Sequence, residues 1–186
     1  MSEDVNIVAI AGSLRKDSYN KALLRAAKEL ASKDLHIEIF DLEGIPVLNQ
    51  DSENKPPEKV KELKAMIRAA DAVLIATAEY NYSVPGVLKN AIDWASRPYG
   101  DSAWYGKPVA LMSASVGMLG GARAQYHLRQ IFVFLNMFPV NQPEVMVTSA
   151  PDKFDNKGNL KDEVTKKLIK DLLKNLAEMT RKLRAK

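Results

Sequence analysis

The chain has 186 residues, 46% of them hydrophobic, which is enough for one globular domain spanning residues 1–186. It contains no cysteine, so disulfides, thiolate metal sites, iron–sulfur clusters and a cysteine nucleophile are excluded, and its two histidines cannot build a multi-histidine metal site. The net charge of +4 would suit a nucleic-acid partner, but residues 161–186 hold nine basic and four acidic residues, so the rest of the chain has a net charge of −1.

The first predicted strand, 5–11, runs into a polar segment with the composition of a phosphate cradle. Gly12 permits a tight turn, and the predicted helix 19–32 that follows has an N-terminus that favours an anion. The residues of this segment that could bind a phosphate are Ser13, Leu14, Arg15, Ser18 and Asn20. The glycine patterns of dinucleotide and nucleoside-triphosphate loops are missing. The alternative is an ordinary polar turn in which Ser18 caps the helix.

The middle of the chain continues the alternation of strands and helices. Its predicted elements are strand 36–40, a surface loop at 50–57, helix 57–69, strand 72–77 and helix 84–96. The loop 78–86 places Tyr80 and Tyr82 among polar residues, where a flat ligand could stack and backbone N–H groups near Asn81 could face its edge. The alternative is that these tyrosines are core or interface residues, with Ser83 as a helix cap.

Strand 107–113 leads into a third unusual loop, 115–121, before the predicted helix 120–136. Its glycines allow the backbone to approach a ligand, and free N–H groups there could stabilise negative charge on a heterocycle. A plain glycine-rich loop is the alternative. Ser113 stands where a nucleophile elbow needs its first glycine, which argues against a hydrolase. We expect His127, on a predicted helix face, to have an ordinary structural or interface role.

The last predicted elements are strand 143–148 and helix 161–183. Apolar residues recur along the helix every three or four positions at Val164, Leu168, Leu172, Leu176, Met179 and Leu183. The basic residues around this stripe indicate a solvated helix face and not an arm that binds nucleic acid or a membrane. The apolar runs are too short to span a bilayer, so we expect a cytoplasmic protein without a membrane or nucleic-acid partner.

Five strand–helix units predict an α/β fold, a doubly wound five-stranded parallel sheet with helices on both faces. The flavodoxin-like strand order 2-1-3-4-5 is the expected arrangement. In that order strands one, three and four are neighbours, so the loops 12–20, 78–86 and 113–121 should meet at one edge of the sheet.

Three segments taken together resemble the NAD(P)H-dependent FMN reductases, a family that includes bacterial quinone, chromate and azo-dye reductases. They are residues 12–20, 79–94 and 120–123, and the similarity runs from about residue 5 to residue 147 in the expected order and spacing. One position departs from the family pattern, because Ala78 stands where the family usually has proline.

The resemblance implies that FMN is the cofactor and that NADH or NADPH is the electron donor. The first segment would hold the FMN phosphate, and the other two loops would contact the ring. The residues implied to bind the cofactor are Ser13, Leu14, Arg15, Ser18, Asn20, Glu79, Tyr80, Asn81, Tyr82, Ser115 and Gly117. We expect no catalytic acid, base or nucleophile and no metal site, because the flavin N5 atom carries the chemistry.

The expected reaction is a ping-pong exchange in which hydride passes from NAD(P)H through the flavin to a small-molecule acceptor. Quinones, chromate, azo compounds and free flavin are the acceptors that the resemblance implies. Two other functions stay open at this point. One is a flavodoxin-like FMN electron carrier without catalytic activity, and the other is a regulator that binds NAD(P) without turnover.

The resemblance also implies a homodimer, often paired into a homotetramer, with each flavin close to a neighbouring subunit. The candidate contact residues are Trp94, Arg97, Tyr99, Trp104, Tyr126, Ile131, Phe134 and Phe138. Packing of these side chains inside one subunit is the alternative.

Overall fold

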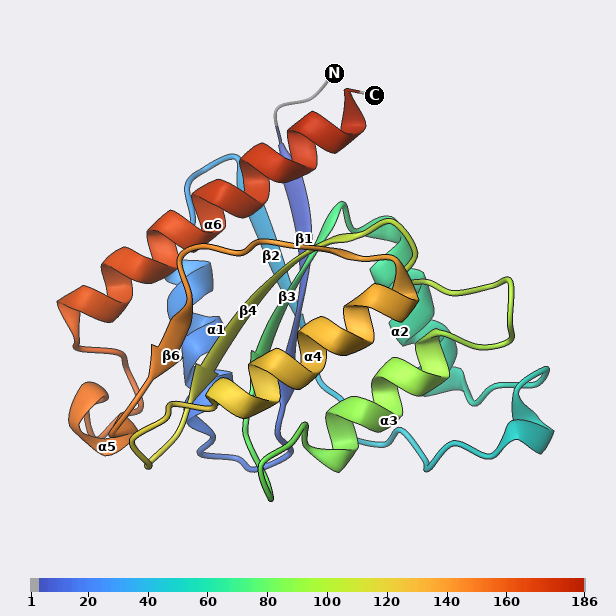
Figure 1. Cartoon of the computed structure of the whole chain (residues 1–186), viewed down its shortest axis with the longest axis horizontal. Coiled ribbons are helices and arrows are strands. Elements are labelled where there is room, and N and C mark those ends of the chain that lie inside the picture. Colours follow the sequence, from blue (N-terminus) through green and yellow to red (C-terminus); the bar gives the residue numbers. More distant parts are fainter. Residues whose placement is uncertain (1–3, 186) are drawn as a thin grey trace.

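The computed structural model describes residues 4–185 as one parallel sheet with helices on both faces (Figure 1). The strands are β1 (Val5–Gly12), β2 (Leu35–Phe40), β3 (Ala72–Thr77), β4 (Pro108–Ala114), β5 (Phe138–Pro139) and β6 (Val145–Val147). The helices are α1 (Tyr19–Leu30), α2 (Glu58–Ala69), α3 (Gly86–Ala95), α4 (Ala122–Leu135), α5 (Ala150–Lys153) and α6 (Glu163–Arg184), with a 3-10 turn at Gln50–Ser52. No described helix is long and apolar enough to cross a membrane.

The strand order β2-β1-β3-β4-β5 confirms the predicted flavodoxin-like arrangement. The fifth position differs in detail from the expected strand 143–148, because two short strands share it. β5 pairs with the start of β4 and β6 pairs with its end. Pro143 lies between them and has no amide hydrogen to donate to a ladder, so the chain leaves the sheet before β6.

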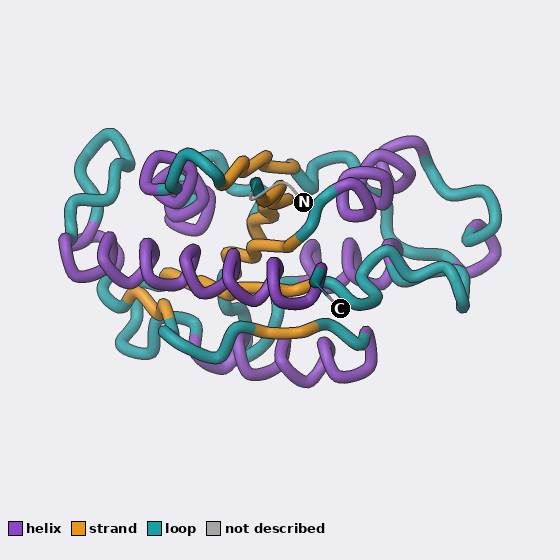
Figure 2. Tube along the Cα trace, turned by 90° about the horizontal axis from the view of Figure 1, so that it is seen from above, coloured by secondary structure: helices purple, strands orange, loops and turns teal. Residues whose placement is uncertain are grey.

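The sheet buries both of its faces, and the pleat divides β3 between two cores. Ala72, Leu74 and Ala76 pack with α1 and α6 on one face. Val73 and Ile75 pack with α2, α3 and α4 on the other. Figure 2 shows the strands between these helices. Burial on both sides explains why β3 reads as a continuous apolar run.

Capping residues set the ends of the helices that flank the sheet. Ser18 caps α1, so the ordinary capping role considered for it is present. α4 begins two residues later than predicted, because Gly120 and Gly121 have φ angles of 58° and 87°. Asp162 caps α6 by accepting from the Thr165 amide.

The apolar face of α6 is rotated slightly from the predicted stripe. Leu172 and Leu176 are buried as expected, but Val164 is exposed. Ile169 and Leu173 are buried in addition. The face of α6 that packs on the sheet therefore includes these two residues and leaves out Val164 in the first turn.

The two tryptophans belong to the core and not to a subunit contact, which corrects that expectation. Trp94 and Trp104 are 2% and 0% exposed. The Trp94 indole donates to the Pro46 carbonyl at 2.8 Å, and the Trp104 indole donates to the Ile92 carbonyl at 3.0 Å. Both side chains therefore have their polar atom satisfied inside one subunit.

Candidate functional site

Three loops leave the sheet together at the carboxyl ends of its strands, as the sequence predicts. This is the lower end of the sheet in Figure 1. β1, β3 and β4 are parallel neighbours whose ends are in register. Gly12 pairs with Thr77, which in turn pairs with Ser113. The loops that this register brings together are 13–18, 78–85 and 115–121.

The first loop presents unpaired amide groups at the N-terminus of α1. In this loop the amides of Leu14, Lys16, Asp17 and Ser18 have no acceptor among residues 4–185. The Arg15 amide donates to Ser13 Oγ at 3.3 Å, which shapes the turn. The Arg15 side chain is exposed and forms no ion pair with any residue from 4 to 185. Free donors, a helix N-terminus and an unpaired guanidinium together suit a phosphate.

Asn20 lies at the start of α1, and its side chain is hydrogen-bonded to the end of β4. It is 3% exposed, its Nδ2 donates to the Ala114 carbonyl at 3.1 Å, and its Oδ1 accepts from the Ala114 amide at 2.9 Å. The side chain thereby ties α1 to the end of β4, just before the third loop. The binding of the phosphate by Asn20 stays a prediction, since the second N–H of its amide is not used by these contacts.

The second loop closes in a tight turn that projects two aromatic rings. Tyr80 and Ser83 exchange backbone hydrogen bonds of 3.1 and 2.9 Å. Asn81 and Tyr82 between them have φ angles of 49° and 67°, the left-handed region in which non-glycine residues are uncommon. Their amides have no acceptor in the described chain. The rings of Tyr80 and Tyr82 are exposed, so this strained turn offers ring surface and free N–H groups together.

Glu79 holds this turn against α4. Its carboxylate accepts from the amides of Arg123 and Ala124 at 3.0 and 3.2 Å, and from Arg123 Nη1 at 3.1 Å. The Arg123 guanidinium in turn lies 3.8 Å from the Tyr82 ring centroid. Glu79 is therefore a positioning residue, because both of its oxygens are occupied by the N-terminus of α4.

Ser83 does not cap α3, contrary to one expectation. Its Oγ lies 2.9 Å from His127 Nδ1 on α4. Pro85 precedes α3 and provides no side-chain cap. The contact gives His127 the structural role that we expected for it.

The third loop is held by one hydrogen bond to β6 and by another within the loop. The Ser115 amide donates to the Val147 carbonyl at 3.0 Å, and Ser115 Oγ accepts from the Gly117 amide at 3.1 Å. The amides of Val116 and Met118 have no acceptor in the described chain. These two N–H groups, more than those of Ser115 and Gly117, remain available to a ligand.

The glycines at the end of this loop are required by space as well as by backbone angle. A Cβ atom on Gly120 would lie 2.8 Å from the Met146 carbonyl carbon, and one on Gly121 would lie 2.7 Å from Ser113 Cβ. The start of α4 is thereby pressed against β4 and β6. This close packing fixes where the third loop meets the other two.

The three loops fit the parts of FMN. A phosphate suits the free amides and Arg15 of the first loop, and a flat ring with hydrogen-bonding edges suits the exposed tyrosines and free amides of the other two. No group of three or more His, Asp or Glu side chains that could hold a metal ion gathers within the described residues.

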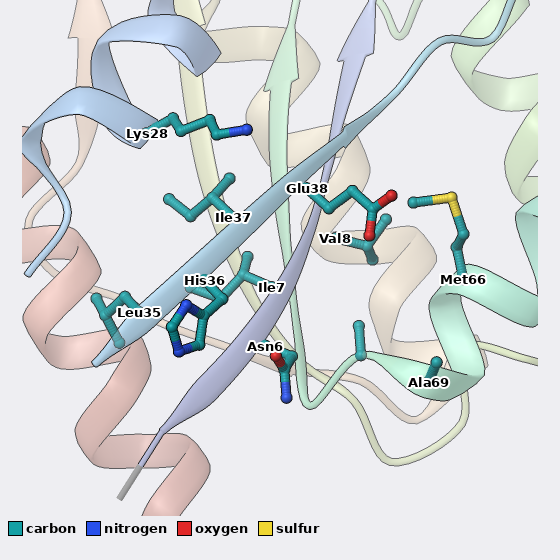
Figure 3. A pocket seen from close by; sticks show the side chains of 11 residues that line it. Asn6, Ile7, Val8, Lys28, Leu35, His36, Ile37, Glu38, Met66 and Ala69 are labelled. Atoms are coloured by element: carbon teal, nitrogen blue, oxygen red, sulfur yellow. The ribbon is translucent and has the colours of Figure 1, made fainter. Parts of the chain in front are cut away.

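A hollow of about 520 Å³ lies elsewhere, along the edge strand β2 (Figure 3). It is lined by residues 6–8 of β1, residues 35–38 of β2, Lys28 of α1 and Met66 of α2. These positions belong to the first halves of the strands, away from the three loops. The hollow therefore lies apart from the loops that the strand register brings together, and we do not assign the cofactor to it.

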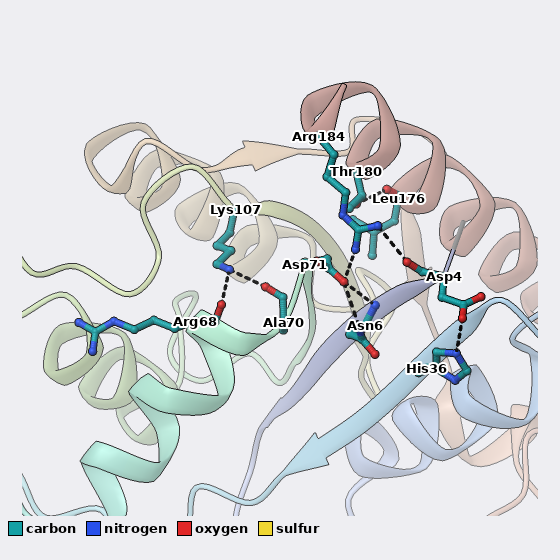
Figure 4. A network of polar contacts seen from close by, with 10 residues as sticks. All are labelled: Asp4, Asn6, His36, Arg68, Ala70, Asp71, Lys107, Leu176, Thr180 and Arg184. Carbon is teal, nitrogen blue, oxygen red and sulfur yellow. Dashed lines mark hydrogen bonds and ion pairs between the residues drawn. The ribbon is translucent and has the colours of Figure 1, made fainter. Parts of the chain in front are cut away.

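The amino ends of the strands lie at the opposite end of the sheet from the three loops. A network of paired charges holds this end together (Figure 4). Asp71 accepts from the Asn6 amide at 2.8 Å and forms an ion pair with Arg184. Burial disfavours the charged form of Asp71, but the hydrogen bonds from Asn6 and Arg184 outweigh it and lower the pKa of this carboxyl. Lys107 donates to the carbonyls of Arg68 and Ala70, and burial lowers its pKa.

Sequence reasoning named Asn20 and the segment that contains Arg123, but it missed the contacts that these residues make with partners far along the chain. Arg123 contacts Glu79 and Tyr82 from more than 40 positions away, and Asn20 contacts Ala114 from 94 positions away. An acidic residue after a buried strand is a weak local signal for the Glu79 contact. No local signal marks the contact made by Asn20.

Comparison with known proteins gives a consistent result. A family described as NADPH-dependent FMN reductase matches residues 5–152. A Pseudomonas aeruginosa protein named NAD(P)H-dependent FMN reductase is 50% identical over 186 residues, covering 99% of this chain and 100% of its own. A 2-hydroxy-1,4-benzoquinone reductase from a Burkholderia species is 42% identical, covering 95% and 97% of the two chains.

A solved structure shares the fold closely. FerB from Paracoccus denitrificans, described as a flavoenzyme NAD(P)H:(acceptor) oxidoreductase, superposes with a TM-score of 0.88 at 35% identity. The match covers 96% of this chain and 98% of that one. The similarity therefore includes the strands and all three loops.

Proposed function

Because this chain belongs to the NADPH-dependent FMN reductase family and is an oxidoreductase that uses FMN and NAD(P)H, we propose that quinones are its electron acceptors. Chromate, azo compounds and free flavin are further acceptors in this proposal. FMN, when bound, supplies an N5 atom that takes hydride from the nicotinamide and passes it on. Donor and acceptor would occupy the same face in turn, which gives ping-pong kinetics.

The first loop would hold the FMN phosphate. Arg15 would pair with it, Ser13 and Ser18 would shape the loop, and the amides of Leu14 and its neighbours would donate to its oxygens. The α1 dipole favours the same charge. Asn20 would contribute indirectly by fixing α1 against β4.

The second and third loops would hold the ring. Tyr80 and Tyr82 offer exposed aromatic surface, and the Asn81 amide offers a donor for the ring edge. Ser115 and Gly117 would shape the third loop, and its free amides, those of Val116 and Met118, would donate to the ring. Glu79 would keep the turn in place through α4. Fixed N–H dipoles at the ring favour negative charge on it.

The observation that carries this assignment is the register of β1, β3 and β4. It places a row of unpaired amides, a strained aromatic turn and a glycine-fixed loop at one edge. No nucleophile or general base is needed there, which agrees with a chain that has no cysteine.

An anaerobic titration of the purified holoprotein tests the proposal. NADH or NADPH should bleach the flavin absorbance without an accessory reductase, and a quinone should restore it. Initial rates at varied donor and acceptor should give parallel double-reciprocal lines. A flavin that neither nicotinamide reduces would contradict the proposal and point to an electron carrier.

The phosphate assignment is tested separately by Arg15→Ala. Loss of a charge-assisted contact should weaken FMN binding by roughly thirtyfold, measured by fluorescence titration of the apoprotein. The matched control is Lys170→Ala, which removes an exposed cation of α6. An unchanged affinity of Arg15→Ala would place the phosphate elsewhere.

We also propose a homodimer, or a tetramer built from dimers, that covers the exposed apolar face of α4. Tyr126, Val133 and Phe134 are 51%, 82% and 76% exposed on this helix. Beside it lies a hollow of about 480 Å³ whose lining includes Tyr99 and Tyr105. An exposed apolar surface of this kind is unusual for a monomer.

The oligomer is tested by analytical ultracentrifugation of the wild type and of Phe134→Glu. The wild type should sediment as a dimer or larger at micromolar concentration, and the variant should dissociate because its charge would be buried. A monomeric wild type would contradict the proposal.

A further inference from the structure

A second hollow, of about 390 Å³, adjoins the first loop from outside the sheet. It lies between the first half of α1 and the segment 151–158, which includes part of α5. These two regions are neighbours at the lower left of Figure 1. Arg15 and Ser18 line both this hollow and the first loop, so the hollow borders the place assigned to the FMN phosphate. We call it the flank hollow.

Three cations from three parts of the chain line the flank hollow. They are Arg15 of the first loop, Arg25 of α1 and Lys157 of the segment after α5. None of them forms an ion pair with a carboxylate of residues 4–185. Cations elsewhere on the same helices do find partners, such as Lys21 with Asp41 at 3.0 Å. Unpaired cations that share one hollow favour an anionic ligand.

Two carboxylates also line the flank hollow, and one of them is already satisfied. Asp155 accepts from the amides of Asn159 and Lys157 at 2.8 and 2.9 Å and from Asn159 Nδ2 at 3.0 Å. The hydrogen bonds from Asn159 and Lys157, together with the nearby charge of Lys157, lower the pKa of Asp155. Asp17 is the other carboxylate, so the lining holds three cations and two carboxylates, and one of the cations, Arg15, is the residue assigned to the FMN phosphate.

The floor of the flank hollow is preformed. The rings of Tyr19 and Phe154 pack with centroids 5.2 Å apart at an interplanar angle of 40°. Phe154 is 4% exposed and forms a backbone bridge with Leu160, which closes the segment into a hairpin. A Cβ atom on Gly158 would lie 3.3 Å from Arg25 Nη2, so the hairpin packs directly against this guanidinium. A rigid floor reduces the entropy lost when a ligand binds.

We propose that the flank hollow binds a phosphomonoester dianion, the 2′-phosphate of NADPH. The inference rests on the proposed function, because the nicotinamide of the same molecule must reach the flavin. Arg25 and Lys157 would contact the 2′-phosphate, and the aromatic floor would support the adenosine. NADH lacks this phosphate, so the flank hollow would set a preference for NADPH.

The inference is tested by binding of two nucleotides that differ in one phosphate. Adenosine 2′,5′-bisphosphate and adenosine 5′-monophosphate are titrated calorimetrically into the FMN-loaded wild type and into an Arg25→Ala/Lys157→Ala variant. The wild type should bind the bisphosphate at least about tenfold more tightly. The variant should lose most of that difference, and Arg25→Lys should keep part of it. The matched control is Lys28→Ala, which removes an exposed cation from the same helix outside the flank hollow.

Steady-state kinetics tests the same inference independently. In the double variant the KM for NADPH should rise about tenfold, whereas kcat and the KM for NADH should stay unchanged. An equal loss with both donors, or equal binding of the two nucleotides by the wild type, would overturn the inference. Binding of inorganic phosphate to the flank hollow without a preference for NADPH would identify a site for free phosphate and overturn it as well.

The two proposals fail in distinguishable ways. The wild type could retain FMN and be reduced by NADH, yet bind the two nucleotides equally well. That result would leave the proposed function intact and would remove only the assignment of the flank hollow. Loss of flavin reduction by both donors in the wild type would remove the proposed function itself.

Discussion

The two ends of the parallel sheet differ in how far their polar groups are hydrogen-bonded or paired. At the amino end, Asp71 is paired with Arg184 and Asn6, and Lys107 reaches two carbonyls at the end of α2. At the carboxyl end, the amides of the first loop have no acceptor in the described chain, and Asn81 and Tyr82 adopt left-handed backbone angles. The polar groups of the amino end have partners and support stability. At the carboxyl end amides lack acceptors and the backbone is strained, as expected of a ligand site.

Topology explains why the two ends differ. In a parallel sheet with crossover helices, each helix after a strand begins near the carboxyl end of the sheet, so positive dipole ends gather there. Glu79 neutralises this effect at α4 by accepting from two of its first amides. Among residues 4–185 no carboxylate accepts from the first amides of α1, so the free amides of the loop before it stay open to an anion.

The largest expected effect comes from filling the space that fixes the carboxyl end. Gly121→Ala should lower the free energy of unfolding by about 3 kcal/mol and impair FMN binding, because its Cβ would collide with Ser113 at a φ angle of 87°. Urea unfolding of the apoprotein measures the first effect and flavin fluorescence measures the second.

The matched control is Gly44→Ala. Gly44 has a φ angle of 85°, but a Cβ atom there would meet no atom within 4 Å. This variant should lose only about 1 kcal/mol, the cost of the backbone angle alone. Equal losses in the two variants would show that close packing under the third loop contributes nothing.

The second prediction concerns the amino end. Asp71→Asn should lower the free energy of unfolding by about 1 kcal/mol at neutral pH and leave FMN binding unchanged, because the charge on Arg184 loses its partner. The pKa of Asp71 is lower in the folded chain than its ordinary value of 3.8. Its stabilising contribution is therefore complete above that value and is lost as the pH falls through the folded pKa.

Unfolding curves at several pH values check this sign. The difference between the wild type and Asp71→Asn should be constant from pH 7 to about pH 5 and should shrink below pH 4. A difference that grows on acidification, or a loss of FMN affinity, would show that the two ends of the sheet are coupled.

The sequence predicts the sheet better than it predicts the site. β3 lies at 72–77 as predicted, because a strand buried on both faces is a continuous apolar run. The split fifth strand and α5 were missed, since two- to four-residue elements leave almost no periodic pattern. The roles of Asn20 and Glu79 depend on backbone atoms of distant strands and helices, which no local pattern encodes.

The third prediction tests how the carboxyl end is kept in order. Glu79→Gln should lower the free energy of unfolding by about 1 kcal/mol and weaken FMN binding several-fold, because Arg123 and the α4 amides lose a charged acceptor. Calorimetry and flavin titration measure the two effects. The matched control, Glu178→Gln, removes an exposed carboxylate on α6 that lies 4.0 Å from Lys174 and should change neither quantity.

The smallest expected effect has the opposite sign. Tyr82→Gly should raise the free energy of unfolding by roughly 0.5 kcal/mol, because relief of the left-handed angle outweighs the lost contact with Arg123. The same variant should weaken FMN binding, since the aromatic surface is gone. Asn136→Gly relieves a φ angle of 51° at the end of α4 and should leave FMN binding unchanged. If Tyr82→Gly binds FMN as the wild type does, the strain at this turn serves no ligand, and the contrast between the two ends would rest on the first loop alone.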